Sequence, residues 1–179
     1  MGAAERRITL IDEVLTGQRV RLRPVQPADE QALTRIFADR EVARWWGDPS
    51  RSVRDVLHPE EGESCYMIEV GADLVGMIQC VEETDPMYEH AGIDIALHSD
   101  WQGKGLGPDA IRTLAQHLIT VRGRHRLTID PAAHNAHAIK AYERVGFKPV
   151  GIMRQYERGP DGTWHDGLLM ELLAEDLVR

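Results

Sequence analysis

A glycine-rich run between an expected strand and an expected helix constrains this chain more than any other feature. The run covers residues 102–107 (sequence QGKGLG), follows the strand-like segment 92–97 and precedes the helix-like segment 108–121. Glycine reaches backbone conformations that other residues resist, so such a turn can aim several N–H groups at one point. With the dipole of the following helix, these donors form a site for a phosphate or pyrophosphate. The run therefore predicts a nucleotide-like cofactor.

Two common phosphate-binding patterns do not describe this run. The P-loop pattern G-x-x-x-x-G-K-[ST] cannot be read here, because Lys104 comes too early. The dinucleotide fingerprint G-x-G-x-x-G also fails, because Gly103, Gly105 and Gly107 alternate. A glycine-rich turn that only closes a strand–helix junction is the alternative interpretation.

Composition and charge narrow the class of protein. The chain of 179 residues has the length of one domain. No apolar run approaches the roughly 20 residues that span a bilayer, and no signal peptide is recognisable, so we expect a cytoplasmic protein without a membrane partner. The formal net charge of 21 − 29 = −8 argues against nucleic acid and suits a cationic ligand, although solubility alone also explains it.

Cysteine and histidine content indicates neither a disulfide framework nor a metal site. Cys65 and Cys80 fall in apolar strand-like segments, where buried free thiols are expected. His134 and His137 are three residues apart, but no cysteine or carboxylate completes a ligand set at convincing spacing. We therefore expect no metal. We also expect the chain to be a monomer or a homodimer.

Hydrophobic periodicity predicts an α/β protein with a mixed sheet. Residues 1–18 are weakly patterned and are expected to be an N-terminal extension of a single domain, 19–179. The acidic segment 82–89 is expected to be a loop. The expected strands are 19–24, 65–70, 74–80, 91–97, 126–130, 148–154 and 168–172, and the expected helices are 27–39, 41–46, 53–57, 105–121 and 135–145.

Two segments resemble the cofactor-binding region of the GNAT superfamily of N-acetyltransferases. The first is 92–97 followed by 101–107, and the second is 135–147, which carries an Asn…Ala…Tyr-Glu-x-x-Gly-Phe pattern. The resemblance covers about residues 19–173. It implies the GNAT fold: a twisted, mixed, mostly antiparallel sheet with helices on both faces and a splay between the fourth and fifth strands, 91–97 and 126–130.

Within this superfamily, four pieces are similar to aminoglycoside 6′-N-acetyltransferases, which confer antibiotic resistance: 44–47, 82–86, 92–94 and 128–131. The segments 16–24 and 161–170 resemble instead the branch that acetylates the N-termini of ribosomal proteins. The resemblance implies transfer of acetyl from acetyl-CoA to the 6′-amine of an aminoglycoside, by direct attack in a ternary complex. A protein N-terminus or another small-metabolite amine is the alternative acceptor, and a non-catalytic acyl-CoA sensor is a third possibility.

The resemblance also assigns a cofactor site. The pyrophosphate would lie on the N–H groups of the glycine run, and the backbone of Ile95 and Leu97 would pair with the pantetheine arm and polarise the thioester carbonyl. Asn135 would bind the arm, although asparagine also suits a helix N-cap. The implied cofactor-binding residues are Ile95, Leu97, Gln102, Gly103, Lys104, Gly105, Leu106, Gly107 and Asn135.

Three residues are candidates for catalysis. Tyr142 shares a helix face with Asn135 and would protonate or stabilise the departing thiolate, unless it is a core residue. The acceptor ammonium must lose a proton before it attacks, which requires a base. Asp94, on the strand face opposite Ile95, and Asp130, at the end of the next strand, are the candidates, although Asp130 also suits the start of a turn.

Four more residues are candidates for acceptor binding. Trp45 and Trp46 would form a wall for a sugar ring or a cation, with one of the pair also a core candidate. Glu83 and Asp85 would supply further anionic contacts, unless they belong to a solvated loop. These residues complete the expected site for a cationic small-molecule amine.

Overall fold

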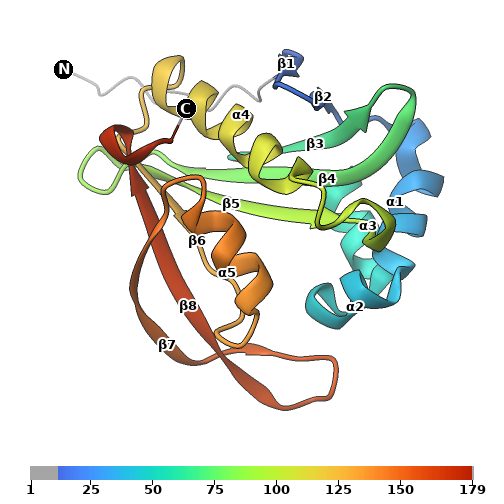
Figure 1. The fold of residues 1–179 in the computed structure, drawn as a ribbon. Helices are drawn as coiled ribbons and strands as arrows, with labels where there is room; N and C mark the ends of the chain where they lie inside the picture. Colours follow the sequence, from blue (N-terminus) through green and yellow to red (C-terminus); the bar gives the residue numbers. More distant parts are fainter. Residues whose placement is uncertain (1–11, 179) are drawn as a thin grey trace.

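A computed structural model describes residues 12–178. Within this range one sheet has the strand order β1-β2-β3-β4-β5-β6-β8-β7, and each neighbouring pair is antiparallel except β5 and β6 (Figure 1). Residues 1–11 of the expected N-terminal extension lie outside the described range. The strands are β1 (Leu15–Thr16), β2 (Arg21–Pro24), β3 (Glu63–Val70), β4 (Asp73–Glu83), β5 (His90–Leu97), β6 (Arg126–Ile129), β7 (Lys148–Arg158) and β8 (Trp164–Leu173).

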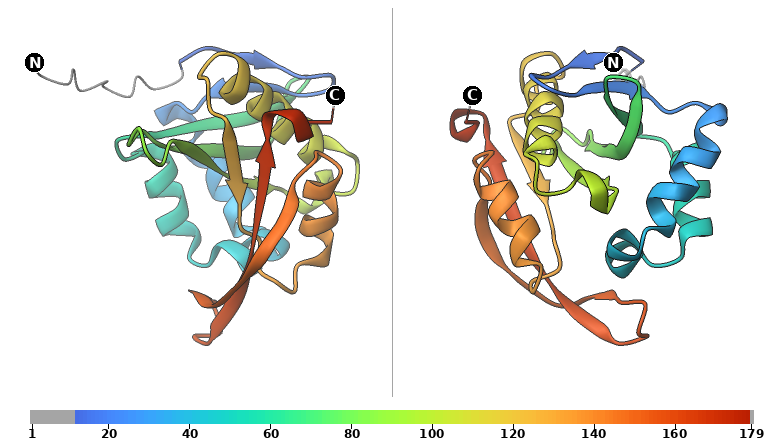
Figure 2. Two further views of the ribbon diagram at one scale, coloured as in Figure 1. Left: turned by 90° about the vertical axis from the view of Figure 1, so that its left-hand side faces the viewer. Right: turned by 45° about the vertical axis from the view of Figure 1, so that its right-hand side comes forward.

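Helices cover both faces of the sheet, as predicted. One face carries α1 (Glu30–Ala38), α2 (Arg40–Trp46) and α3 (Pro49–Leu57), and the other carries α4 (Leu106–Thr120) and α5 (Ala136–Glu143) (Figure 2). α3 begins four residues before the expected 53–57, because Asp48 caps it by accepting a hydrogen bond from the Ser50 N–H (3.0 Å). No helix within residues 12–178 combines the length and apolar character needed to cross a bilayer.

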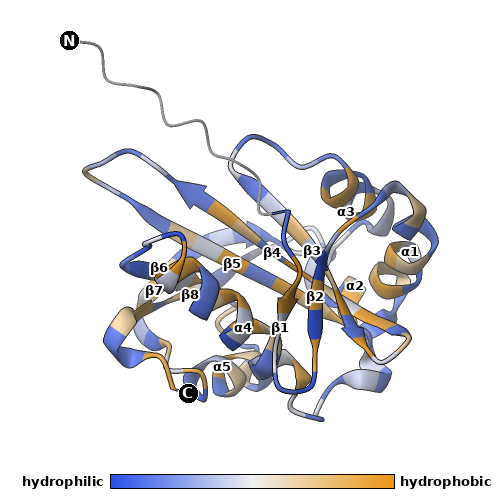
Figure 3. Cartoon of the chain, turned by 90° about the horizontal axis from the view of Figure 1, so that it is seen from above, coloured by the Kyte–Doolittle hydropathy of each residue, from blue (hydrophilic) through white to orange (hydrophobic). Residues whose placement is uncertain are grey.

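Alternation along the central strands builds two hydrophobic cores, one on each side of the sheet. On β4, Ile78 packs toward α4 while Met77 packs toward α1 and α3. On β5, Ile93 belongs to the α4 side and Ala96 to the other, which puts Asp94 on the same strand face as Ala96. In Figure 3 apolar and polar positions alternate as coloured bands along the strands and flanking helices. Both cysteines are buried free thiols in these layers, as expected.

The predicted splay lies between β5 and β6. These parallel strands pair at Ala91 with Leu127 and at Gly92 with Thr128, and then diverge. β6 instead continues antiparallel to β8 along its other edge. Residues 93–97 of β5 therefore turn one backbone edge toward a gap in the sheet rather than toward a neighbouring strand.

The segment 82–89 is not entirely a loop, which corrects the sequence-based expectation. β4 continues to Glu83, and the fully buried side chain of Glu82 forms ion pairs with Arg122 (2.8 Å) and Arg124 (2.7 Å). Both arginines come from the connection after α4, about forty residues away. A carboxylate can be buried here because two cations compensate its charge.

Both ends of the chain extend the sheet further than predicted. β1 pairs with β2, so residues 15–16 of the expected extension belong to the sheet. The β7–β8 hairpin includes 155–158 and 164–167, beyond the expected 148–154 and 168–172. These added segments are mostly polar or exposed, so they lack the apolar alternation that marks a strand. The longer hairpin swings out beyond the rest of the sheet (Figure 2).

Candidate active site

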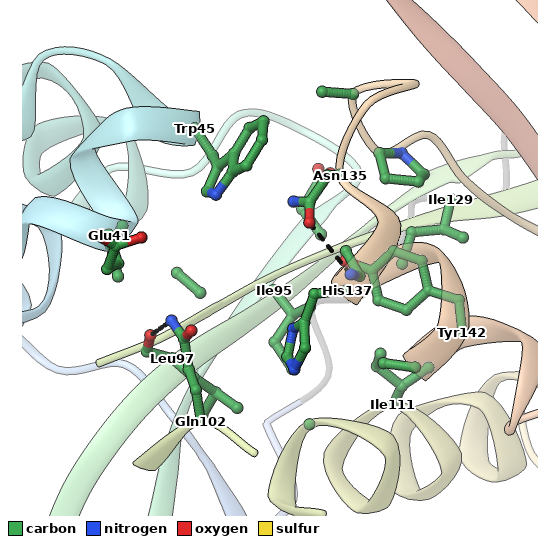
Figure 4. A pocket seen from close by; sticks show the side chains of 18 of the residues that line it. Glu41, Trp45, Ile95, Leu97, Gln102, Ile111, Ile129, Asn135, His137 and Tyr142 are labelled. Atoms are coloured by element: carbon green, nitrogen blue, oxygen red, sulfur yellow. Dashed lines mark hydrogen bonds between the residues drawn. The ribbon is translucent and has the colours of Figure 1, made fainter. Parts of the chain in front are cut away.

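A cavity of about 630 Å³ occupies the splay and extends to the glycine run. Its walls come from β5, the start of α4, the end of β6, α5 and α2. In the close-up, Trp45 of α2 lies across the cavity from His137 and Tyr142 of α5, with Ile95 of β5 near the centre and Leu97 beside Gln102 (Figure 4). Two predicted regions, the glycine run and the two aspartates, thus meet in one space.

The glycine run forms the predicted tight turn into a helix. Gly103 (φ 71°) and Gly105 (φ 80°) adopt left-handed conformations, and Gly105 is the N-cap of α4. The Gln102 side chain donates to the Leu97 carbonyl (2.8 Å), which fixes the turn against the end of β5. A Cβ at Gly107 would lie 3.3 Å from the Leu97 side chain. Because the first N–H groups of a helix have no partner inside it, this packing produces a cradle of backbone donors.

Two residues of the run turn their side chains away from this cradle. The Lys104 ammonium lies 4.9 Å above the Trp101 ring rather than over the turn. Leu106 is only 1% exposed and belongs to the hydrophobic core beneath α4. Lys104 and Leu106 therefore contribute to the turn through their backbone.

Arg19 brings a cation to the run that the sequence analysis did not identify. Its guanidinium donates to the Lys104 carbonyl, and its Nη1 lies 3.6 Å from the position that a Cβ on Gly105 would take. The buried Asp109 holds the Arg19 backbone by accepting from its N–H (2.8 Å). These partners lie about ninety residues apart in the sequence, so no local sequence pattern indicates their contact.

Asn135 fills the helix N-cap, which was one of its two expected roles. Its Oδ1 accepts from the Ala138 N–H (3.1 Å) at the start of α5. Its amide nitrogen points into the cavity (Figure 4). The cap therefore leaves a side-chain donor facing the open edge of β5.

The two aspartates line the same cavity and raise the local negative charge. Burial raises the pKa of Asp94 to about 6, and the neighbouring charge of Asp130 adds to this shift. Gln79 opposes the shift by donating to Asp94 Oδ2 (3.3 Å). A carboxylate tuned in this way is ionised at neutral pH and is a stronger base than an exposed aspartate.

Tyr142 remains protonated at the cavity wall. Burial raises its pKa well above the usual range, and the charges of Asp94 and Asp130 raise it further. Its ring lies 6.4 Å from that of Phe147, at the edge of the core, and both expected roles for Tyr142 are compatible with this position. The hydroxyl group therefore keeps its proton and can donate a hydrogen bond into the cavity.

An aromatic wall lies on the side of the cavity opposite the glycine run. Trp45 lines the cavity and packs against His134 (ring centroids 5.1 Å apart, tilted by 47°), which in turn lies 5.5 Å from His165 of β8 in an adjoining pocket. Trp46 packs 5.2 Å from Phe37 in the core below α1 and also reaches the cavity lining. The pair therefore divides as expected, with one tryptophan packed against the core and one on an open wall.

Two further residues of β7 reach this end of the cavity and were missed by the sequence analysis. Glu157 lines the cavity, and burial raises its pKa. The Tyr156 hydroxyl lies within hydrogen-bonding reach of the Asp130 carboxylate, which raises the pKa of Tyr156 to about 12. Both residues fall in the part of the hairpin that had no apolar alternation, so no sequence signal placed them here.

The structure does not bring Glu83 and Asp85 to the cavity. They lie at the β4–β5 turn, where Glu83 pairs with His90, whereas the cavity opens at the other end of β5. Their carboxylates instead organise the turn, since Glu83 accepts from the Asp85 N–H (2.8 Å) and Asp85 accepts from the Met87 N–H (2.9 Å). The structure therefore does not support the expected contacts of Glu83 and Asp85 with a substrate in this cavity.

Comparison with known proteins gives consistent similarities. A family model described as an acetyltransferase (GNAT) domain matches residues 19–148. Spermidine N(1)-acetyltransferase of Escherichia coli K12 is 24% identical, covering 76% of this chain and 77% of that protein. Aminoglycoside N(6′)-acetyltransferase type 1 of Klebsiella pneumoniae is 28% identical, covering 68% of each chain. The structure of Mycobacterium smegmatis RimJ in complex with CoA-disulfide superposes with a TM-score of 0.80 at 24% identity, covering 94% and 90% of the two chains.

Proposed function

Because the chain belongs to the GNAT family of acetyltransferases, we propose that it acetylates a cationic small-molecule amine, foremost the 6′-amine of an aminoglycoside. The acetyl donor of this family is acetyl-CoA. The observation that carries the proposal is the polarity of the cavity, which has backbone donors at one end and, at the other, three carboxylates (Asp94, Asp130 and Glu157) against one cation among the described residues, Arg44 over the Trp45 ring. The anionic acetyl-CoA would bind at the end with the backbone N–H groups. The cationic amine would bind at the end with the carboxylates.

The geometry of the donor end supports a pyrophosphate site there. The left-handed glycines leave the turn without side chains where phosphate oxygens would approach, and Arg19 adds positive charge beside it. The open backbone edge of Ile95 and Leu97 would pair with the pantetheine arm as a strand does, with Asn135 donating from the other wall. An N–H of this edge would then polarise the thioester carbonyl.

The acceptor end supplies the proton transfers. Asp94 would bind the ammonium and take its proton, directly or through water, with Asp130 sharing the positive charge. The freed amine would attack the thioester carbon and form the amide bond as the carbon–sulfur bond breaks, and the nitrogen would release its second proton, which replaces the one that Tyr142 gives up. Tyr142 would give its proton to the leaving thiolate. Both cysteines are buried and burial raises their pKa values to about 12, which favours direct attack over an acyl-cysteine intermediate.

The aromatic wall favours a ring-shaped acceptor. Trp45 offers an aromatic surface beside the carboxylates Asp130 and Glu157, and His134 packs against it at a tilt of 47°, a combination suited to an amino sugar. A linear polyamine would use the same negative charges without needing the aromatic surface. A peptide N-terminus, the other alternative, brings a single ammonium and gains less from several carboxylates.

Release of CoA over a panel of amines tests the proposal. Purified protein with acetyl-CoA should turn over a kanamycin-type aminoglycoside with a higher kcat/KM than spermidine or a peptide that begins with alanine. Mass spectrometry of the product should place one acetyl group on the 6′-amine. Turnover of spermidine or the peptide without turnover of any aminoglycoside would reassign the acceptor, and no turnover of any amine would overturn the proposal.

A further inference from the structure

β7 is irregular where it passes the acceptor end of the cavity. Its register moves from Met153 opposite Gly167 to Glu157 opposite His165, so residues 154–156 lie opposite the single residue 166. A bulge of this kind bends its strand and redirects side chains. Gln155 at its centre has a φ of 51°, the one positive value at a non-glycine residue within residues 12–178. Such a conformation persists where neighbouring groups hold it.

Asp166 is the group that holds this bulge. Its Oδ1 accepts a hydrogen bond from the Gln155 N–H (2.8 Å). Its own carbonyl accepts from the Ala133 N–H (2.8 Å), and the next residue, Gly167, bridges to Ala132. Asp166 therefore joins the bulge to the loop that directly follows Asp130.

The bulge determines where two side chains of the site lie. The Tyr156 ring rests on Gly167, because a Cβ built there would lie 2.9 Å from Tyr156 Cδ1. From this position the Tyr156 hydroxyl reaches Asp130, and the following Glu157 lines the cavity. Because Gly167 has no side chain, it leaves room for the Tyr156 ring.

We propose that Asp166 is a positioning residue for the acceptor end, which acts through the Gln155 bulge to set Tyr156 against Asp130 and Glu157 into the cavity. Tyr156 in turn orients the Asp130 carboxylate toward the acceptor ammonium. The kinetic consequence rests on the proposed function, whereas the placement of Tyr156 does not.

Kinetics on the full chain test the consequence. Asp166→Ala should lower kcat/KM for the preferred amine by about tenfold to a hundredfold, the scale of a small misplacement in an active site, with KM for acetyl-CoA unchanged. Asp166→Asn should recover most of this loss, because its amide oxygen still accepts from the Gln155 N–H. Wild-type acceptor kinetics in Asp166→Ala, or an equal loss of acceptor and acetyl-CoA affinity, would overturn the proposal.

Variants of Gln155 distinguish the effect of the bulge conformation from any direct effect of the Asp166 carboxylate. Gln155→Gly should keep acceptor kcat/KM, because glycine adopts the left-handed conformation readily. Gln155→Val should reproduce the Asp166→Ala loss, because a β-branched residue resists that conformation. Equal activity in the glycine and valine variants would contradict the role of the bulge.

Ionisation of Tyr156 tests its placement without any turnover. The tyrosinate absorbance of each protein is compared with that of its Tyr156→Phe counterpart at pH 11, with circular dichroism as the check on folding. A pKa of about 12 leaves Tyr156 mostly protonated in the wild type. In Asp166→Ala the pKa should fall toward the ordinary value of about 10, so the residue should be mostly ionised. Unchanged protonation in Asp166→Ala would refute the placement even if the acceptor assignment holds, and failure of the amine panel alone would leave this result standing.

Discussion

Replacing Asp130 with asparagine should move the pH dependence of the enzyme in a direction that the structure fixes. The pKa of Asp94 is raised from 3.8 to about 6, which corresponds to about 3 kcal/mol between its two protonation states. Burial is the largest cause and the charge of Asp130 the next. Asp130→Asn removes the second cause and keeps the first, so the pKa of Asp94 should fall but stay above 3.8.

The assay is kcat/KM for the preferred amine between pH 4.5 and 8. If Asp94 is the base, the wild-type value should rise with pH through a midpoint of about 6, as the carboxylate ionises. In Asp130→Asn the midpoint should lie at lower pH. Asp94→Asn should abolish this limb and lower kcat/KM by about 10²–10⁴. Glu83→Gln is the matched control, because Glu83 lies outside the cavity and its loss should leave the midpoint in place.

Two results would refute this reasoning. A midpoint in Asp130→Asn that is unchanged or higher would mean that the two carboxylates do not interact. Full activity of Asp94→Asn on every accepted amine would place the base elsewhere.

Stability offers a parallel check, because a raised folded-state pKa contributes stability below about 4 that is lost as pH rises through 6. Asp94→Asn should therefore gain thermal stability relative to the wild type above pH 6.

Three further changes test other parts of the structure. Gly105→Asp should abolish acetyl-CoA binding in calorimetry, because it strains a φ of 80° and places an anion at the phosphate cradle; unchanged affinity would remove the cofactor from this turn. Tyr142→Phe should lower kcat with KM for acetyl-CoA preserved, as expected for an interaction made mainly in the transition state, and wild-type turnover would make it a core residue. Glu82→Gln should lower the free energy of unfolding in urea by about 3–5 kcal/mol, since Arg122 and Arg124 lose their buried counter-charge, and a loss under about 1 kcal/mol would show that water compensates them.

Local patterns in the sequence were sufficient to predict most of the fold. Alternation around Ile93 and Ile95 identified the central strand, and the helical repeat of Ile111, Leu114 and Leu118 identified the helix that follows the glycine run. These signals are strong because each element buries one continuous apolar face. The turn itself was predictable because Gly105 must adopt a conformation that other residues resist.

The parts that could not be predicted depend on pairing between distant segments. Arg19 reaches the cradle because Asp109 holds its backbone, and Glu82 is buried because Arg122 and Arg124 arrive from beyond α4. Glu157 reaches the cavity through a bulge in a polar hairpin. None of these placements follows from a periodicity, since each depends on a partner roughly ten to ninety residues away.

The open backbone edge of β5 has a consequence for how such a protein diverges. A donor recognised by N–H and C=O groups of the main chain is recognised in a way that side-chain substitution scarcely alters. Apart from Asp94 and Asp130, the residues proposed to face the acceptor stand on other elements, α2 and the β7–β8 hairpin. Mutations in these elements can change which amine is accepted and leave the binding of the acetyl donor unaltered. The gap in the sheet thus separates a constant half of the reaction from a variable half, and selection can act on the second alone.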